Sequence, residues 1–209
     1  MTKIRLYRKV RQKMLPGDVI AFSGQGMFSR VVKFATNSNV SHVGIILRTK
    51  IQEDTTGRFF NQIIESTSLD GFHGVTISQF SKRLRNYIGD IWWLPLTASA
   101  RERFNQKVFF DFMLKQEGKP YDVSQAIKSA LDLLESIGIT YNKEDFRKFF
   151  CSELAAAGLE KSKVLPEINA SKVTPIDLCE FPIFKEAVQL KGELNDIKRY
   201  PPMQIRFER

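Results

Sequence analysis

The 209-residue chain contains only two cysteines and two histidines. Two cysteines cannot form the disulfide framework that stabilises small secreted domains, so the chain must fold on a hydrophobic core. There is no C-x-x-C or H-x-x-x-H spacing, and the two cysteines are far apart in the sequence. The sequence therefore offers no recognisable zinc site, and we expect neither a metal nor a cofactor.

Long apolar runs are also missing. No stretch of about 20 apolar residues could span a bilayer. The basic N-terminal residues are followed by a polar and charged stretch instead of the apolar core of a signal peptide. We therefore expect a cytoplasmic protein. Because 43% of the residues are hydrophobic, the chain can bury a substantial core, and we predict a single domain over residues 1–209.

Acidic residues are absent before Asp18, whereas six of the 32 basic residues precede it. Such a basic arm, over residues 1–15, can contact phosphates of lipid or nucleic acid, although many arms of this kind are simply solvated. We expect at most weak contact with an anionic surface. The rest of the chain has no RNA-binding, zinc-finger or helix-turn-helix signature, so no specific nucleic acid is expected. The six basic residues are Lys3, Arg5, Arg8, Lys9, Arg11 and Lys13.

Strand patterns gather in the first half of the chain and helix patterns in the second half. A capping box from Ser99 to Glu102 predicts a helix that ends near Gln116, and Thr174 followed by Pro175 predicts a short one. A further helix is expected after Asp122 and is predicted to end at Gly138, within a helical insertion over about 123–148. These patterns predict an α+β fold in which an antiparallel, barrel-like sheet packs against helices. The expected strands are 18–23, 42–48, 59–66, 74–77 and 90–95.

His42 opens a strand that is rich in β-branched residues, and a turn-like segment separates it from the apolar run that contains Glu65. If the hairpin turns near Glu53 and Asp54, His42 faces Glu65 directly or nearly so. A carboxylate there could accept the Nδ1–H of the imidazole and stabilise the imidazolium. An ordinary surface Glu–His pair is the alternative. The other histidine, His73, lies between glycines and is predicted to be in a solvated loop.

Cys151 stands at the predicted start of an alanine-rich helix. Unpaired N–H groups and the helix dipole favour a thiolate at this position. With a histidine in reach, the thiolate could be a nucleophile, and without one Cys151 would be a small buried residue. The second cysteine, Cys179, is expected to be a packed helical residue.

Seven segments, in this order, resemble the permuted branch of the NlpC-type, papain-like cysteine peptidase and amidase superfamily, within the YiiX/YebB-like group. In unpermuted relatives the cysteine precedes the histidine, whereas here the histidine and the acid come first. Geometry and not chain order defines such a site. The matching segments are 16–22, 28–36, 41–45, 64–66, 118–122, 150–154 and 173–178.

The resemblance implies that His42 is the base, Glu65 orients it and Cys151 is the nucleophile. Gln25 and Tyr121 are the candidates for a substrate-binding donor that would stabilise an oxyanion beside the Cys151 backbone N–H. The helical segment at about 123–148 is a departure from the family pattern and could reshape the substrate groove.

We therefore expect a cysteine hydrolase that cleaves an amide bond through an acyl-enzyme, in a peptide such as a cell-wall fragment. One alternative is a lipid acylhydrolase or acyltransferase that uses the same three residues. Another is a peptide- or lipid-binding module that has the fold but no turnover. A third is a nucleic-acid-binding protein that acts through residues 3–13.

Overall fold

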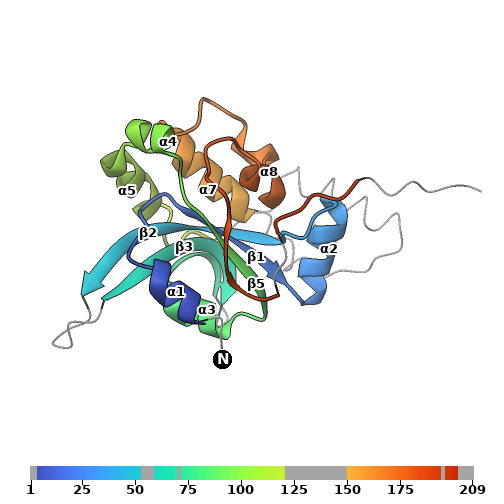
Figure 1. Cartoon of the computed structure of the whole chain (residues 1–209). Helices are drawn as coiled ribbons and strands as arrows, with labels where there is room; N and C mark the ends of the chain where they lie inside the picture. Colours follow the sequence, from blue (N-terminus) through green and yellow to red (C-terminus); the bar gives the residue numbers. More distant parts are fainter. Residues whose placement is uncertain (1–3, 53–58, 70–71, 121–149, 194–195, 202–209) are drawn as a thin grey trace, which may run out of the picture.

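A six-stranded antiparallel sheet forms the centre of the protein in a computed structural model that describes residues 4–52, 59–69, 72–120, 150–193 and 196–201 (Figure 1). The strand order is β4-β3-β2-β1-β5-β6, so β4 and β6 are the two edges. The bounds are β1 Val19–Gly24, β2 His42–Gln52, β3 Phe59–Leu69, β4 Phe72–Gln79, β5 Gly89–Leu94 and β6 Val188–Lys191.

Helices cover both faces of this sheet (Figure 1). Helices α4 (Ala98–Arg103), α5 (Gln106–Leu114), α7 (Phe150–Lys161) and α8 (Pro175–Cys179) lie on one side. Helices α1 (Ile4–Val10) and α3 (Phe80–Asn86) lie on the other side, and α2 (Met27–Ala35) lies beside the end of β1. A short 3-10 helix, η2, spans Ala170–Lys172.

The alternation of side chains along the strands creates two separate cores. In β1, Val19 and Ala21 belong to the core shared with α5, α7 and α8, whereas Ile20 and Phe22 belong to the core shared with α1 and α3. Because both faces are covered, all six residues of β1 are buried.

Buried Asp18 ties the start of β1 to the neighbouring elements. Its carboxylate accepts hydrogen bonds from the backbone N–H of Leu15 at 2.8 Å and of Leu96 at 3.0 Å, and from the indole of Trp93 at 2.9 Å. Arg101 of α4 pairs with the same carboxylate. These contacts replace the water molecules that the buried carboxylate has lost. They also fix the position of the chain where it enters β1.

The predicted α+β class with an antiparallel sheet is confirmed, but the barrel-like shape is wrong because the sheet is open between β4 and β6. The sequence analysis also missed β6, a four-residue edge strand. The expected helix over 99–116 is two helices, because Thr97 caps the first and Asn105 caps a second. Thr174 caps α8 in a capping box, as expected.

Two further expectations differ from the structure. Part of the predicted basic arm is helix α1, and Tyr7 anchors it in the second core with 3% exposure. His73 does not lie in a loop, because it belongs to β4 and pairs with Ser68 of β3. The predicted helical insertion at 123–148 lies outside the described residues, and the single-domain prediction stays a prediction. No described helix is both long and apolar enough to cross a membrane.

Candidate functional site

His42 is the first residue of β2 and pairs with Phe22 of β1. The preceding residue, Ser41, donates its backbone N–H to Phe22 O at 2.9 Å, and its hydroxyl accepts from Gly24 N at 3.0 Å. These bonds hold the entry to β2 against the end of β1. The imidazole lies against the Phe22 ring with centroids 5.2 Å apart, and only 7% of His42 is exposed. The ring is therefore held in one position by backbone pairing and packing.

Glu65 of β3 is fully buried and hydrogen-bonds to His42, with Oε2 2.6 Å from Nε2. The bonded nitrogen is Nε2, and not Nδ1 as expected from the sequence. This arrangement leaves Nδ1 for a second partner. The sequence analysis therefore brought the correct pair together but assigned the wrong ring nitrogen.

The predicted register of the hairpin is also wrong, by two residues. Ile45 pairs with Ile64, and one further step along β2 places Gly44 opposite Glu65. His42 is thus a diagonal neighbour of Glu65. The pair nearest the turn is Gln52 with Phe59, so the two strands reverse direction about two residues later in the chain than predicted. The register also shifts at two places along β2, between Ile46 and Arg48 and between Arg48 and Ile51. Because side chains alternate with a period of two, a shift of two residues keeps His42 and Glu65 on the same face.

Arg83 of α3 is a site residue that the sequence analysis missed. Its Nε donates to Glu65 Oε1 at 2.8 Å and its Nη2 to Oε2 at 3.2 Å, which makes a bidentate ion pair. The guanidinium also lies over the rings of Phe22 and Tyr87, at 5.1 and 4.9 Å from their centroids. The sequence did carry a sign of this role, because Arg83 lies on the same face of the helix as the buried residues Phe80 and Leu84. A cation buried on that face needs an anionic partner.

Cys151 is the second residue of α7 and is 1% exposed. The Cys151 thiol lies close enough to His42 for its charge and hydrogen bonding to raise the pKa of the imidazole, and α7 lies on the opposite side of the sheet from α3 (Figure 1). Residues 121–149, which precede this helix, lie outside the described part of the chain. The structure thus places Cys151, His42 and Glu65 next to one another.

The charges of this cluster stabilise one another. Burial raises the pKa of Glu65, but the Arg83 cation and the hydrogen bond from His42 outweigh it and lower the pKa to about 2. Burial likewise lowers the pKa of His42, but the charge and hydrogen bond of Cys151, together with those of Glu65, raise it to about 9. The raised pKa of His42 therefore favours the imidazolium at neutral pH, beside the Glu65 carboxylate.

Tyr87, which follows α3, was also missed. Burial raises the pKa of its phenol to about 12, even though a hydrogen bond with Ser41 and the Arg83 cation act to lower it. The hydroxyl therefore stays protonated at neutral pH. Tyr87 thus adds a partly buried hydroxyl beside Ser41, the residue that precedes His42.

The remaining predicted site residues lie elsewhere or outside the described part. Gln25 is exposed in the link between β1 and α2, and Tyr121 is not among the described residues. Cys179 ends α8, and burial together with the negative charge at Cys151 raises the pKa of its thiol. Among the residues that the structure describes, no group of three or more His, Cys, Asp or Glu side chains could hold a metal ion.

Comparison with known proteins adds little to this geometry. No family model matches the chain, and no curated protein matches it. Among solved structures, the chain is similar to that of the metalloprotein yiiX from Escherichia coli O157:H7, with 15% identity and a TM-score of 0.45. The alignment covers 85% of this chain and 98% of that one. A likeness at this level carries no inference about the site, so the relationship to the permuted papain-like superfamily stays a prediction.

Replacing Arg83 with methionine is expected to destabilise the protein by about 3 kcal/mol, because it removes one partner of a fully buried carboxylate. Urea unfolding monitored by tryptophan fluorescence measures this change. Arg85→Met is the matched control, because Arg85 is exposed on the same helix and its loss should cost about 0.5 kcal/mol or less. Equal stabilities of the two variants would contradict the structural role of Arg83.

The titration of His42 should depend on Cys151. In the wild-type protein the His42 ring should titrate at about pH 9, whereas in Cys151→Ser its midpoint should fall because the negative charge that raises the pKa is lost. Proton NMR of the imidazole resonances measures both midpoints. The chain has only two histidines, so a His73→Gln variant assigns the signals. An unchanged His42 midpoint in Cys151→Ser would exclude a charged Cys151 beside the ring.

Proposed function

We propose that this protein is a cysteine hydrolase that cleaves an amide bond, with a permuted papain-like arrangement of its catalytic residues. Cys151 is the nucleophile, His42 is the acid and base, and Glu65 orients His42. The observation that supports this most directly is a series of contacts: Arg83 pairs with Glu65, Glu65 hydrogen-bonds to His42, and Cys151 lies close enough to raise the pKa of His42.

The surroundings of Cys151 favour its reactive form. The thiol stands in the first turn of the 12-residue helix α7, where the positive end of the helix dipole stabilises an anion. The raised pKa of His42 keeps the imidazole protonated beside it at neutral pH. The resting state in this proposal is therefore a thiolate–imidazolium ion pair, as catalysis by a cysteine requires.

In the first half of the reaction the Cys151 thiolate attacks the carbonyl carbon, and a C–S bond forms while the carbonyl electrons move to oxygen. The tetrahedral intermediate collapses when the C–N bond breaks. The His42 imidazolium gives its proton to the leaving amine through Nδ1, the nitrogen that Glu65 does not bind. The products of this half are a free amine and a thioester on Cys151.

In the second half, neutral His42 takes a proton from water, and the resulting hydroxide equivalent attacks the thioester carbonyl. The C–S bond then breaks, which releases a carboxylic acid and restores the ion pair of Cys151 and His42. Arg83 holds Glu65 as a carboxylate throughout, so that Glu65 can stabilise the imidazolium whenever it forms.

The oxyanion is stabilised by the backbone N–H of Cys151 and a second donor. Gln25 is the candidate that lies within the described residues. Phe22 pairs with His42, and Gln25 follows three residues later, past the same end of the sheet. The side chain is exposed and has no structural partner in the described part of the chain, so it is free to turn toward a substrate.

A lipid acylhydrolase or acyltransferase that uses the same residues is the second candidate. Two large apolar side chains near the site end of the sheet favour it. Met27 begins α2 just after β1 and is 73% exposed, and Ile88 precedes β5 and is 72% exposed. Such residues could hold an acyl chain. A peptide with apolar side chains, for example a cell-wall fragment, could use the same surface.

The ion pair predicts an unusual pH profile for alkylation of Cys151 by iodoacetamide. The rate should stay high well below pH 8, where an ordinary thiol with a pKa of about 8.5 becomes protonated and slow. In His42→Ala this acid-side reactivity should disappear. Mass spectrometry of the separate peptides measures the rates, with Cys179 as an internal control because the raised pKa of its thiol makes it slow at neutral pH. If the Cys151 profile is the same in both proteins, the activated thiolate is excluded.

Turnover is expected to depend wholly on Cys151. A panel of fluorogenic peptide amides and p-nitrophenyl esters of increasing chain length tests the amide and acyl classes separately. Cys151→Ala should lose hydrolysis of whichever probe the wild type cleaves while its circular dichroism is unchanged. Hydrolysis that survives in a purified Cys151→Ala protein would contradict the mechanism. A wild type that binds peptides but turns over none would favour the binding module.

A further inference from the structure

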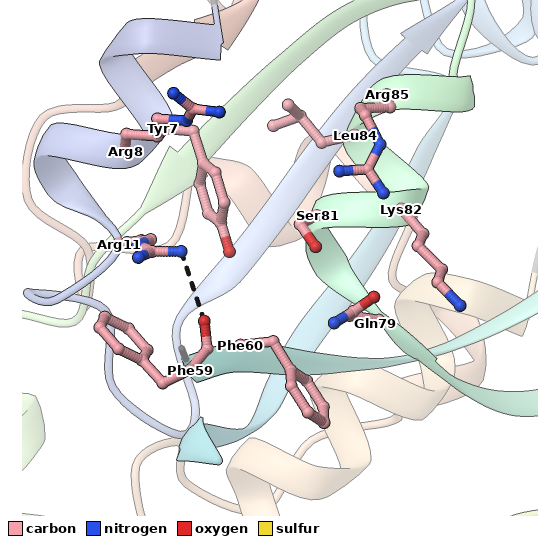
Figure 2. Close-up of a pocket in the computed structure, with 10 residues that line it drawn as sticks. All are labelled: Tyr7, Arg8, Arg11, Phe59, Phe60, Gln79, Ser81, Lys82, Leu84 and Arg85. Carbon is pink, nitrogen blue, oxygen red and sulfur yellow. Dashed lines mark hydrogen bonds between the residues drawn. The ribbon is translucent and has the colours of Figure 1, made fainter. Parts of the chain in front are cut away.

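A pocket lies between α1, α3 and the start of β3, on the face of the sheet opposite α7 (Figures 1 and 2). Its volume is about 680 Å³, which is in the range of small-molecule sites. None of its lining residues is Cys151, His42, Glu65 or Arg83. The pocket is therefore separate from the proposed catalytic residues.

The pocket is strongly basic. Arg8 and Arg11 line it from α1 and the turn that follows, and Lys82 and Arg85 line it from α3, whereas no acidic residue contributes to its wall. Among the residues that the structure describes, none forms an ion pair with Arg8, Lys82 or Arg85. Four cations around one cavity repel one another, and an anion in the cavity relieves this repulsion.

Tyr7 places a polar group inside this basic wall. The residue is 3% exposed, and its side chain extends from α1 so that the hydroxyl lies in the space toward Ser81 (Figure 2). Burial raises the pKa of Tyr7 to about 12 although Arg11 acts to lower it, so the hydroxyl remains a hydrogen-bond donor. Within the described part of the chain the hydroxyl has no hydrogen-bond partner. It is thus a nearly buried donor that faces a cavity without a protein acceptor.

The floor of the pocket is aromatic. Phe59 and Phe60 line it at the start of β3. The Arg11 guanidinium lies 4.2 Å from the Phe59 ring centroid and donates to Phe59 O at 3.3 Å (Figure 2). These contacts hold one cation in place before any ligand arrives, which lowers the entropic cost of binding. The volume also leaves room for an organic group beside a phosphate.

We propose that this pocket binds a phosphate ester, with the phosphate between the cations of α1 and α3 and the Tyr7 hydroxyl, and the organic part against Phe59 and Phe60. Arginine and lysine are suited to phosphate because they supply charge and several N–H donors. The proposal does not depend on the hydrolase activity, because it uses none of the proposed catalytic residues.

Isothermal titration calorimetry with glycerol 3-phosphate, in a buffer without phosphate or sulfate, tests this site in the full-length protein. A combined Arg8→Gln, Lys82→Gln and Arg85→Gln variant should bind about tenfold more weakly or worse, since three charged donors are lost. The matched control is Lys9→Gln, Lys115→Gln and Lys172→Gln, which removes the same charge from exposed positions outside the pocket. This control should bind like the wild type.

Tyr7→Phe gives a second measurement that does not depend on the folding of the triple variant. It removes only the hydroxyl and keeps the edge-to-face contact with Phe80, at 5.2 Å between centroids. Binding should weaken roughly fivefold. The site is refuted if glycerol 3-phosphate and the vesicles described below both fail to bind, or if the pocket and control variants weaken binding equally, because that result indicates only general electrostatic attraction.

Co-sedimentation with phosphatidylcholine vesicles, with and without phosphatidic acid, distinguishes the source of the phosphate ester. Phosphatidic acid carries the same phosphomonoester on a membrane. A lipid headgroup is supported if the protein binds these vesicles more tightly than glycerol 3-phosphate and if the Arg8→Gln, Lys82→Gln and Arg85→Gln variant loses this binding. Equal or weaker binding to the vesicles supports a soluble phosphate ester. Either result supports the pocket as the phosphate site.

Discussion

The buried carboxylate of Glu65 is the constraint on which the site depends. A fully buried anion is unstable in a protein unless cations and hydrogen bonds replace the water that it has lost. Here Arg83 binds it in a bidentate pair and His42 donates to its remaining lone pairs. The first contact fixes α3 against the sheet, and the second orients the ring of His42 and, together with Cys151, raises its pKa. The position of one helix and the orientation of one histidine ring therefore depend on the same carboxylate.

Local patterns in the sequence predicted the parts of the site that depend on neighbours in the chain. The thiol at a helix start, the histidine at a strand start and the Thr174 cap each rest on a few consecutive residues. The class of the fold followed from the distribution of strand and helix patterns. The pairing of His42 with Glu65 was found despite a wrong register because the error was an even number of residues.

Features that depend on distant contacts could not be predicted in this way. Arg83 is one of 32 basic residues, and although the buried stripe of Phe80 and Leu84 indicates that it turns inward, nothing in α3 alone identifies Glu65 as its partner. The open sheet depends on edge strands, one of which is only four residues long. Helix α1 resembled a solvated arm because its anchor, Tyr7, is a single residue among basic neighbours, and its packing depends on α3. In each case the deciding partner lies far along the chain.

Helix α1, β1–β4 and α3, which together hold His42, Glu65 and Arg83, all precede Asp90 in the chain, whereas Cys151 lies much later. Protein synthesis proceeds from the N-terminus, so these charged groups leave the ribosome and can pair before the thiol has been made. The pairs of Glu65 with Arg83 and His42 can therefore form in a chain that still lacks Cys151. In the proposed mechanism this order means that an unfinished chain carries no thiol for His42 to activate.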